Sequence, residues 1–137
     1  MTASRQMTAA EDDCKASAID ESHLGRMTLG DRRLEREVLE LFLRQTTIML
    51  GRIVDADPPL VAAAAHTLKG SARGIGAWRV AEASELLEQA AGGDGGEDGR
   101  GPDLAEAIAE LKAASLDAGS AIGARLTRLL AELGRER

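Results

Sequence analysis

The chain has 137 residues and a formal net charge of -6, with one tryptophan, one phenylalanine and no tyrosine. This length fits one ordinary domain and leaves no room for an ATP-binding kinase domain beside a second module. The acidic chain has no basic stripe, which argues against nucleic acid as the main partner. Alanine, leucine, glutamate and arginine are abundant, and these residues favour helices over strands.

The N-terminal segment and the single cysteine indicate the cellular compartment of the protein. Residues 1–18 are polar and contain no apolar core of a secretory signal, and they read as a flexible leader before a domain at 19–137. No apolar run approaches the roughly 18–20 residues that cross a bilayer. Cys14 cannot form a disulfide within the chain, which suits a reducing compartment. We therefore expect a cytoplasmic protein that does not enter the membrane.

Apolar residues at helical spacing predict five helices. The first is short, at about residues 19–26, with Leu24 and Met27 as its apolar points. Asp31 can cap the second helix, at about 32–54. The core-facing stripe expected there consists of Leu34, Val38, Leu41, Phe42, Gln45, Ile48, Met49 and Ile53.

Two prolines and a glycine-rich segment divide the rest of the chain. Pro58 and Pro59 end the second helix, and Pro59 suits the first turn of a third at about 59–73. A fourth helix at about 77–91 precedes a glycine-rich segment at 92–102, which fits a flexible loop of unassigned role and no nucleotide-binding pattern. A last helix spans about 104–133. This order predicts an all-α antiparallel four-helix bundle with an additional short N-terminal helix, large enough to bury its own core as a monomer.

The third helix carries the residues with chemical content. On a helical wheel, Leu60, Ala64 and Leu68 face the core, whereas His66 points to solvent. A neutral imidazole, with an unperturbed pKa of about 6.5, is a nucleophile near neutral pH. The outer face around it is made of small and cationic residues, namely Ala62, Ala63, Lys69, Gly70 and Arg73.

Two of these neighbours have specific uses beside a nucleophilic histidine. A glycine in a helix interior costs about 1 kcal/mol relative to alanine, so Gly70 suggests a gain elsewhere, such as access for a bulky donor. The ammonium of Lys69, one turn from His66, can attract a phosphoryl group. Each residue alone also fits an ordinary role, as solvated surface or a close helix crossing, and the combination at this spacing is what favours function.

The segment HTLKGSA at 66–72, with IGA at 75–77 and LE at 87–88, resembles the signature of histidine phosphotransfer (HPt) domains. The resemblance implies that His66 accepts a phosphoryl group on Nε2, that Lys69 assists electrostatically and that Gly70 leaves room for the donor. It also implies that Glu88, twenty-two positions after the histidine, orients the imidazole through its other nitrogen. The family's partners are receiver domains of response regulators and of hybrid histidine kinases. The carrier needs no cofactor of its own, and Mg²⁺ belongs to the receiver.

Two alternatives to a phosphoryl carrier stay open on the sequence. One is a helical adaptor that binds receivers without accepting phosphate, and the other is a purely structural bundle. For a carrier, Leu24 and Met27 together with Ala62, Ala63 and Arg73 are the residues we expect to meet the partner. His23, His66 and Cys14 are too few and too scattered for a zinc site. Trp78 is assigned to packing at the start of the fourth helix.

Overall fold

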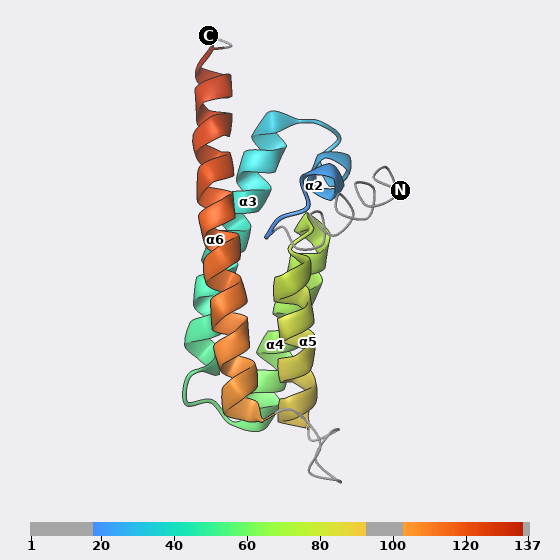
Figure 1. Ribbon diagram of the computed structural model, residues 1–137, viewed down its shortest axis with the longest axis vertical. Helices are drawn as coiled ribbons and strands as arrows, with labels where there is room; N and C mark the ends of the chain where they lie inside the picture. The colour runs from blue at the N-terminus through green and yellow to red at the C-terminus, as the bar shows by residue number, and fades with distance from the viewer. Residues whose placement is uncertain (1–17, 93–102, 136–137) are drawn as a thin grey trace, which may run out of the picture.

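The computed structural model describes residues 18–92 and 103–135, and within these ranges it contains five helices and no strand. They are α2 (Glu21–Met27), α3 (Arg32–Ile53), α4 (Pro58–Ile75), α5 (Trp78–Gly92) and α6 (Leu104–Arg135). In Figure 1, α3 to α6 run alternately up and down the long axis, and α2 lies near the end of the bundle where α4 finishes. The predicted all-α antiparallel bundle with an extra short helix is confirmed. Residues 1–17 of the predicted leader and 93–102 of the predicted loop lie outside the described residues.

Local sequence signals account for the helix ends. Every expected end lies within two residues of the observed one. The Asp31 carboxylate caps α3 by accepting hydrogen bonds from the backbone N–H groups of Arg33 and Leu34, at 3.0 and 3.1 Å. Pro58 and Pro59 occupy the first turn of α4, where a missing N–H leaves no hydrogen bond unmade.

The core lies along the axis of the four long helices. Each neighbouring pair in the ring α3–α4–α5–α6 is in contact, and α2 packs on α4. Each long helix contributes large side chains with no more than 2% exposure, which include Leu39, Ile53, Val61, Leu68, Val80, Leu87, Leu111, Ile122 and Leu129. None of the described helices is both long and apolar enough to span a lipid bilayer.

The predicted core stripe of α3 is correct only in part: Phe42 and Ile53 are buried, and Val38 and Met49 pack against the core, but three other members do not. Leu34, Leu41 and Ile48 are exposed, and the buried face instead contains Leu39 and Thr46. Thr46 tolerates burial because its hydroxyl donates a 2.8 Å hydrogen bond to the Phe42 carbonyl one turn earlier. The sequence of α3 therefore carries two apolar rows, and only one of them faces the core.

The third helix shows a smaller error of the same kind. Leu60, expected in the core, is exposed, and Val61 occupies the buried position beside it. The expected core residues Ala64 and Leu68 are buried as predicted, and Ile75 is buried as well. The rotation of α4 around His66 is consequently close to the expected one.

Asp20 joins α2 to the turn between α4 and α5. Gly76 ends α4 with φ of 81°, and a Cβ on it would lie 3.0 Å from the Asp20 side chain and carbonyl, so only glycine fits without displacement. The Asp20 N–H donates to the Gly76 carbonyl at 2.9 Å, and the Trp78 indole N–H donates to the Asp20 carboxylate at 3.0 Å. The hydrogen bond from Trp78, with a second from the His23 backbone, lowers the pKa of Asp20. Trp78 thus packs at the start of α5, as predicted, and also holds α2.

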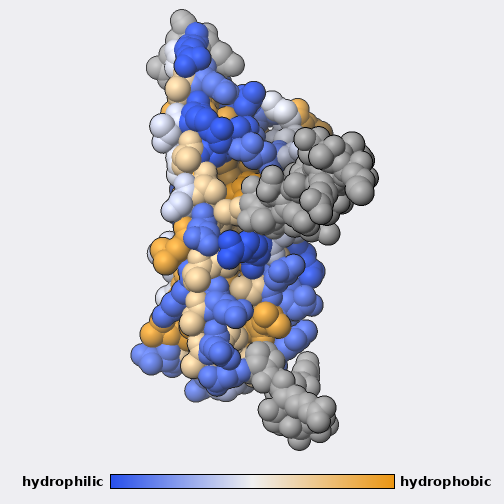
Figure 2. Space-filling model, viewed as in Figure 1, coloured by the Kyte–Doolittle hydropathy of each residue, from blue (hydrophilic) through white to orange (hydrophobic). Residues whose placement is uncertain are grey.

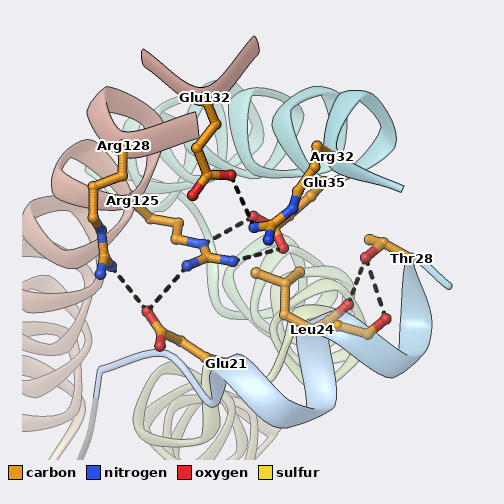
Figure 3. Close-up of polar contacts among 9 residues, drawn as sticks. Glu21, Leu24, Thr28, Arg32, Glu35, Arg125, Arg128 and Glu132 are labelled. Carbon is orange, nitrogen blue, oxygen red and sulfur yellow. Dashed lines mark hydrogen bonds and ion pairs between the residues drawn. The ribbon is translucent and has the colours of Figure 1, made fainter. Parts of the chain in front are cut away.

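A second set of polar contacts ties α2 and α3 to α6 (Figure 3). The Arg125 guanidinium donates two hydrogen bonds to the Glu35 carboxylate, at 2.9 and 3.1 Å, and Glu35 is almost fully buried. This pairing raises the pKa of Arg125. Arg128 donates to Glu21 of α2 at 2.9 Å, and Arg125 lies 3.8 Å from the same carboxylate oxygen. Besides packing on α4, the short helix is therefore tied to α5 through Asp20 and Trp78 and to α6 through Glu21.

The surface seen in Figure 2 is largely hydrophilic, with hydrophobic side chains in separate patches between charged ones. Four large apolar side chains on α2, α3 and α4 are at least half exposed: Met27, Leu41, Ile48 and Leu60. Apolar side chains this exposed on neighbouring helices are candidates for contact with another molecule.

Candidate functional site

His66 projects from the middle of α4, away from the core. Its side chain is 67% exposed, and its Nδ1 lies 2.8 Å from the Glu88 carboxylate of α5. The chain reverses direction around Ala77, and residues 66 and 88 are each eleven positions from it. In an antiparallel pair, positions equally far from the turn lie at the same height, so this spacing brings the two side chains together.

Glu88 binds two partners with its two oxygens. Oε2 faces His66, and Oε1 accepts a hydrogen bond from the Lys69 ammonium at 2.7 Å. The bond from Lys69 is the main cause of a lowered pKa at Glu88, and the bond with His66 acts in the same direction against desolvation. The carboxylate is therefore ionised and acts as an acceptor, which requires His66 to carry its proton on Nδ1. The lone pair of a neutral imidazole is then on Nε2.

Gly70 lies one turn after His66 on the same face, and nothing in the chain's own packing requires it. A Cβ built at this position meets no described atom within 4 Å, and the backbone has ordinary helical dihedral angles. The same holds for Gly74, one turn further. Glycine at these positions lowers the stability of the helix and is not needed for packing. It leaves the helix surface beside the histidine without protruding side chains.

The other residues predicted to contact a partner differ in their exposure to solvent. Ala63 and Arg73 are exposed and Ala62 is half-buried, all on the outer side of α4, and Arg73 lies 3.9 Å from Glu85. Met27 is exposed at the end of α2. The prediction that Leu24 meets a partner is wrong, because its side chain is completely buried. Leu24 is the one buried residue within α2, and its side chain is part of the core of the bundle.

A groove beside this face was not predicted from the sequence. It has a volume of about 290 Å³ and lies where α2, α3 and the last turns of α4 meet. Met27, Leu41 and Gly74 are among the residues that line it. The repeat of Leu34, Leu41 and Ile48 at intervals of seven was the available signal, because it forms an apolar row apart from the core row.

No metal centre accompanies these side chains in the part of the chain that the structure describes. Within residues 18–92 and 103–135, no three histidine, cysteine, aspartate or glutamate side chains are grouped as metal ligands. The polar side chains that meet at this face are an exposed imidazole, a carboxylate and an ammonium.

Comparison with known protein families agrees with this geometry. The family model described as the Hpt domain matches residues 37–135, which is more than half of the chain and includes the whole of α4, α5 and α6. No curated protein matches the chain. Hpt domains are phosphocarriers of two-component phosphorelays, interact with receiver domains and have no ATP site of their own. The chain belongs to the Hpt domain family of histidine phosphotransfer domains.

Proposed function

We propose that this protein accepts a phosphoryl group on Nε2 of His66 from the phosphoaspartate of one receiver domain and passes it to the aspartate of another. The donor would be a hybrid histidine kinase or a response regulator. The observation that carries the proposal is the exposed imidazole whose Nδ1 is held by Glu88, next to a glycine that internal packing does not require. We further propose that the carrier acts as a monomer in the cytoplasm.

The transfer needs little from the carrier beyond a positioned nucleophile. The Nε2 lone pair attacks phosphorus in line, so that the N–P bond forms while the P–O bond to the aspartyl carboxylate breaks. The electron pair leaves with that carboxylate, and the imidazole becomes an imidazolium that keeps its Nδ1 proton. Positioning and charge supply the catalysis, as in other phosphoryl transfers. The carrier uses no cofactor, and the Mg²⁺ that neutralises the phosphoryl oxygens comes with the receiver.

The receiver is proposed to dock over the outer face of α4 and the adjoining groove. Ala63, Gly70 and Gly74 keep the surface around His66 low, so a receiver's active-site loops can approach the imidazole. Met27 and Leu41, both more than half exposed, offer apolar area at the groove. Arg73 and Lys69 add positive charge toward a partner that carries phosphate. Leu24 lines the groove but has no exposed surface of its own.

Transfer of label tests the proposal directly. A panel of receiver domains would be phosphorylated on aspartate with ³²P-labelled acetyl phosphate and mixed with the wild-type protein or with His66→Gln. We expect acid-labile, alkali-stable label on the wild type alone. Wild type that binds receivers yet takes up no label from any of them would make the protein an adaptor, and label on His66→Gln would place the acceptor elsewhere.

The docking face has its own test in a matched pair of surface variants. Ala63→Arg places a long cationic side chain next to His66, and Ala109→Arg places the same side chain on the exposed side of α6. Both alanines are exposed, so both variants should keep the thermal stability of the wild type. We expect Ala63→Arg alone to block transfer, and normal transfer in that variant would refute the docking face.

A further inference from the structure

The outer side of α6 carries two large apolar side chains on the part of the bundle that faces away from α4. α6 packs on α3 and α5, so α4 with its histidine lies across the ring of helices from it. Figure 1 shows α6 along one edge of the bundle, with no other labelled helix over its outer side. Leu116 and Leu130 on this side are 74% and 53% exposed. A single exposed leucine needs no explanation, so the spacing and the charges around these two decide what they mean.

The two leucines are placed symmetrically about Gly123. Leu116 lies seven residues before it and Leu130 seven residues after it, which is about two helical turns in each direction. Gly123 is exposed, and a Cβ on it would meet no described atom within 4 Å, so another helix can approach its backbone closely. When a second α6 lies antiparallel across Gly123, Leu116 of each chain meets Leu130 of the other.

The charges on one side of this row are complementary in the same arrangement. On a helical wheel, one flank of the row carries Glu110 and Asp117 in the first half of α6, and Arg128 and Arg135 in the second half. A two-fold antiparallel pair brings the same flank of both helices together. Asp117 then lies within one residue of the level of Arg128 in the second copy, and Glu110 meets Arg135 in the same way. A parallel pair would instead place acid beside acid.

Asp117 and Arg128 already have partners within the chain, but these are surface contacts. Asp117 accepts a hydrogen bond from Arg79 at 3.2 Å, and Arg128 donates one to Glu21 at 2.9 Å. The four side chains are between 49% and 58% exposed. Ion pairs in solvent contribute little and exchange partners readily, so a second copy can join them without disturbing the fold.

We infer that the outer side of α6 is a surface on which two copies of this chain pair, antiparallel across Gly123. A lasting interface takes about 20–30 residues from each side, and one helix face supplies roughly half of that, so the pair is weak and transient. Each chain carries out transfer alone, as the monomer proposed above, and pairs only where chains are concentrated. The pairing leaves His66 of both copies open, because α4 lies on the other side of the bundle.

Sedimentation velocity of the full-length protein tests whether the pair forms, at concentrations from about 10 µM to about 1 mM, which cover weak complexes. The average mass of the wild type should rise with concentration, and that of Leu116→Arg or Leu130→Arg should not. Leu41→Arg is the matched control, because Leu41 is 58% exposed on α3, and it should associate like the wild type. A wild type that stays monomeric throughout, or association that is lost in Leu41→Arg, would overturn the inference.

Cysteine cross-linking on a Cys14→Ser background tests the direction of packing. Leu116→Cys protein is mixed with Leu130→Cys protein under mild oxidation. The mixed disulfide should form faster than either protein links to itself, because antiparallel packing places these two positions opposite each other. Faster self-linking of either protein would indicate parallel packing or another surface, and would contradict the inference.

Charge exchange tests the flank of the row. Glu110→Arg and Arg135→Glu each place like charges opposite each other, and each contact occurs twice in a symmetric pair. Either variant should therefore weaken association about tenfold, and the double variant should restore it. A double variant that associates no better than the weaker single variant would refute the antiparallel pairing of these charges.

Transfer of label separates this inference from the proposed function. Leu116→Arg should accept the phosphoryl group at the wild-type rate, because α6 does not meet the receiver. Slow transfer in this variant, with an unchanged circular dichroism spectrum, would make the outer side of α6 a receiver contact and overturn the pairing. Wild type that pairs but takes up no label would refute the proposed function alone.

Discussion

Replacing Gly70 should make the fold more stable and slow the transfer of the phosphoryl group. It lies in the interior of α4, one turn after His66, where a Cβ meets no described atom within 4 Å. Gly70→Ala should therefore raise the free energy of unfolding by about 0.5–1 kcal/mol, because alanine has less freedom to lose on folding. For a domain of this size, the midpoint of thermal unfolding should rise by about 2–4 °C.

The effect on transfer follows from the position of the new side chain. Side chains four residues apart on a helix have Cβ atoms about 6 Å apart, so a substituent at Gly70 stands beside the imidazole. A displacement of the phosphoryl donor by about 1 Å costs up to about a hundredfold in rate. We expect Gly70→Ala to slow transfer measurably and Gly70→Gln to slow it about a hundredfold.

Gly123 supplies the matched control for this prediction. It is an exposed glycine inside α6, also with no described atom within 4 Å of a built Cβ. Gly123→Ala should gain similar stability and transfer at the wild-type rate. Circular dichroism would follow unfolding, and transfer from a labelled receiver would follow activity. If Gly70→Gln transfers as fast as the wild type, the glycine does not provide access, and the docking geometry is wrong.

Other parts of the structure give further predictions. Arg125→Met should lower the free energy of unfolding by about 3 kcal/mol in urea titration, because the buried Glu35 carboxylate loses its partner; a change below about 1 kcal/mol would show that the pair hardly contributes. Gly76→Ala should also destabilise the fold, since φ of 81° and contact with Asp20 both oppose a side chain, and an unchanged midpoint of unfolding would refute that reading. Asp20→Asn should be less stable than the wild type at pH 7. A carboxyl group whose pKa is lowered by folding stabilises above its unfolded pKa of about 3.9, so this difference should shrink as pH falls below about 4, and a constant difference would exclude the linkage. Leu41→Glu, at an exposed position, should weaken receiver binding without lowering stability, and unaltered affinity would remove Leu41 from the docking face.

The fold was predictable because local signals and periodicity agreed. Asp31 and the two prolines at 58–59 marked helix ends, and the Asp31 cap of α3 and the proline-containing first turn of α4 form as expected. Periodicity alone could not predict which side of α3 faces the core. Leu39 and Leu41 belong to two different apolar rows of this helix, and the two rows are similarly hydrophobic. The deciding residues are Thr46 and Glu35, which are polar and buried because each finds a partner. The partner of Glu35 could not be identified from the sequence, since Arg125 lies 90 positions away.

The candidate site, like the fold, was predictable from the sequence only in part. The helical wheel around His66 indicated which face of α4 matters, and the resemblance to the HPt signature implied that Glu88 contacts the imidazole. The commitment of Lys69 to Glu88 could not be read from spacing, because Lys69 could equally have turned to solvent. Leu24 and Met27 are three residues apart on a short helix, and only packing against the bundle shows which of them is buried.

The identity of the phosphorylated atom tests the central claim most directly. The wild-type protein, labelled with ¹⁵N-histidine and phosphorylated by a receiver domain, would be examined by ³¹P and ¹⁵N nuclear magnetic resonance. We predict phosphorus bonded to Nε2 of His66, with the proton still on Nδ1, and no such signal in His66→Gln. Phosphorus on Nδ1 of His66, or on any other side chain, would contradict the account.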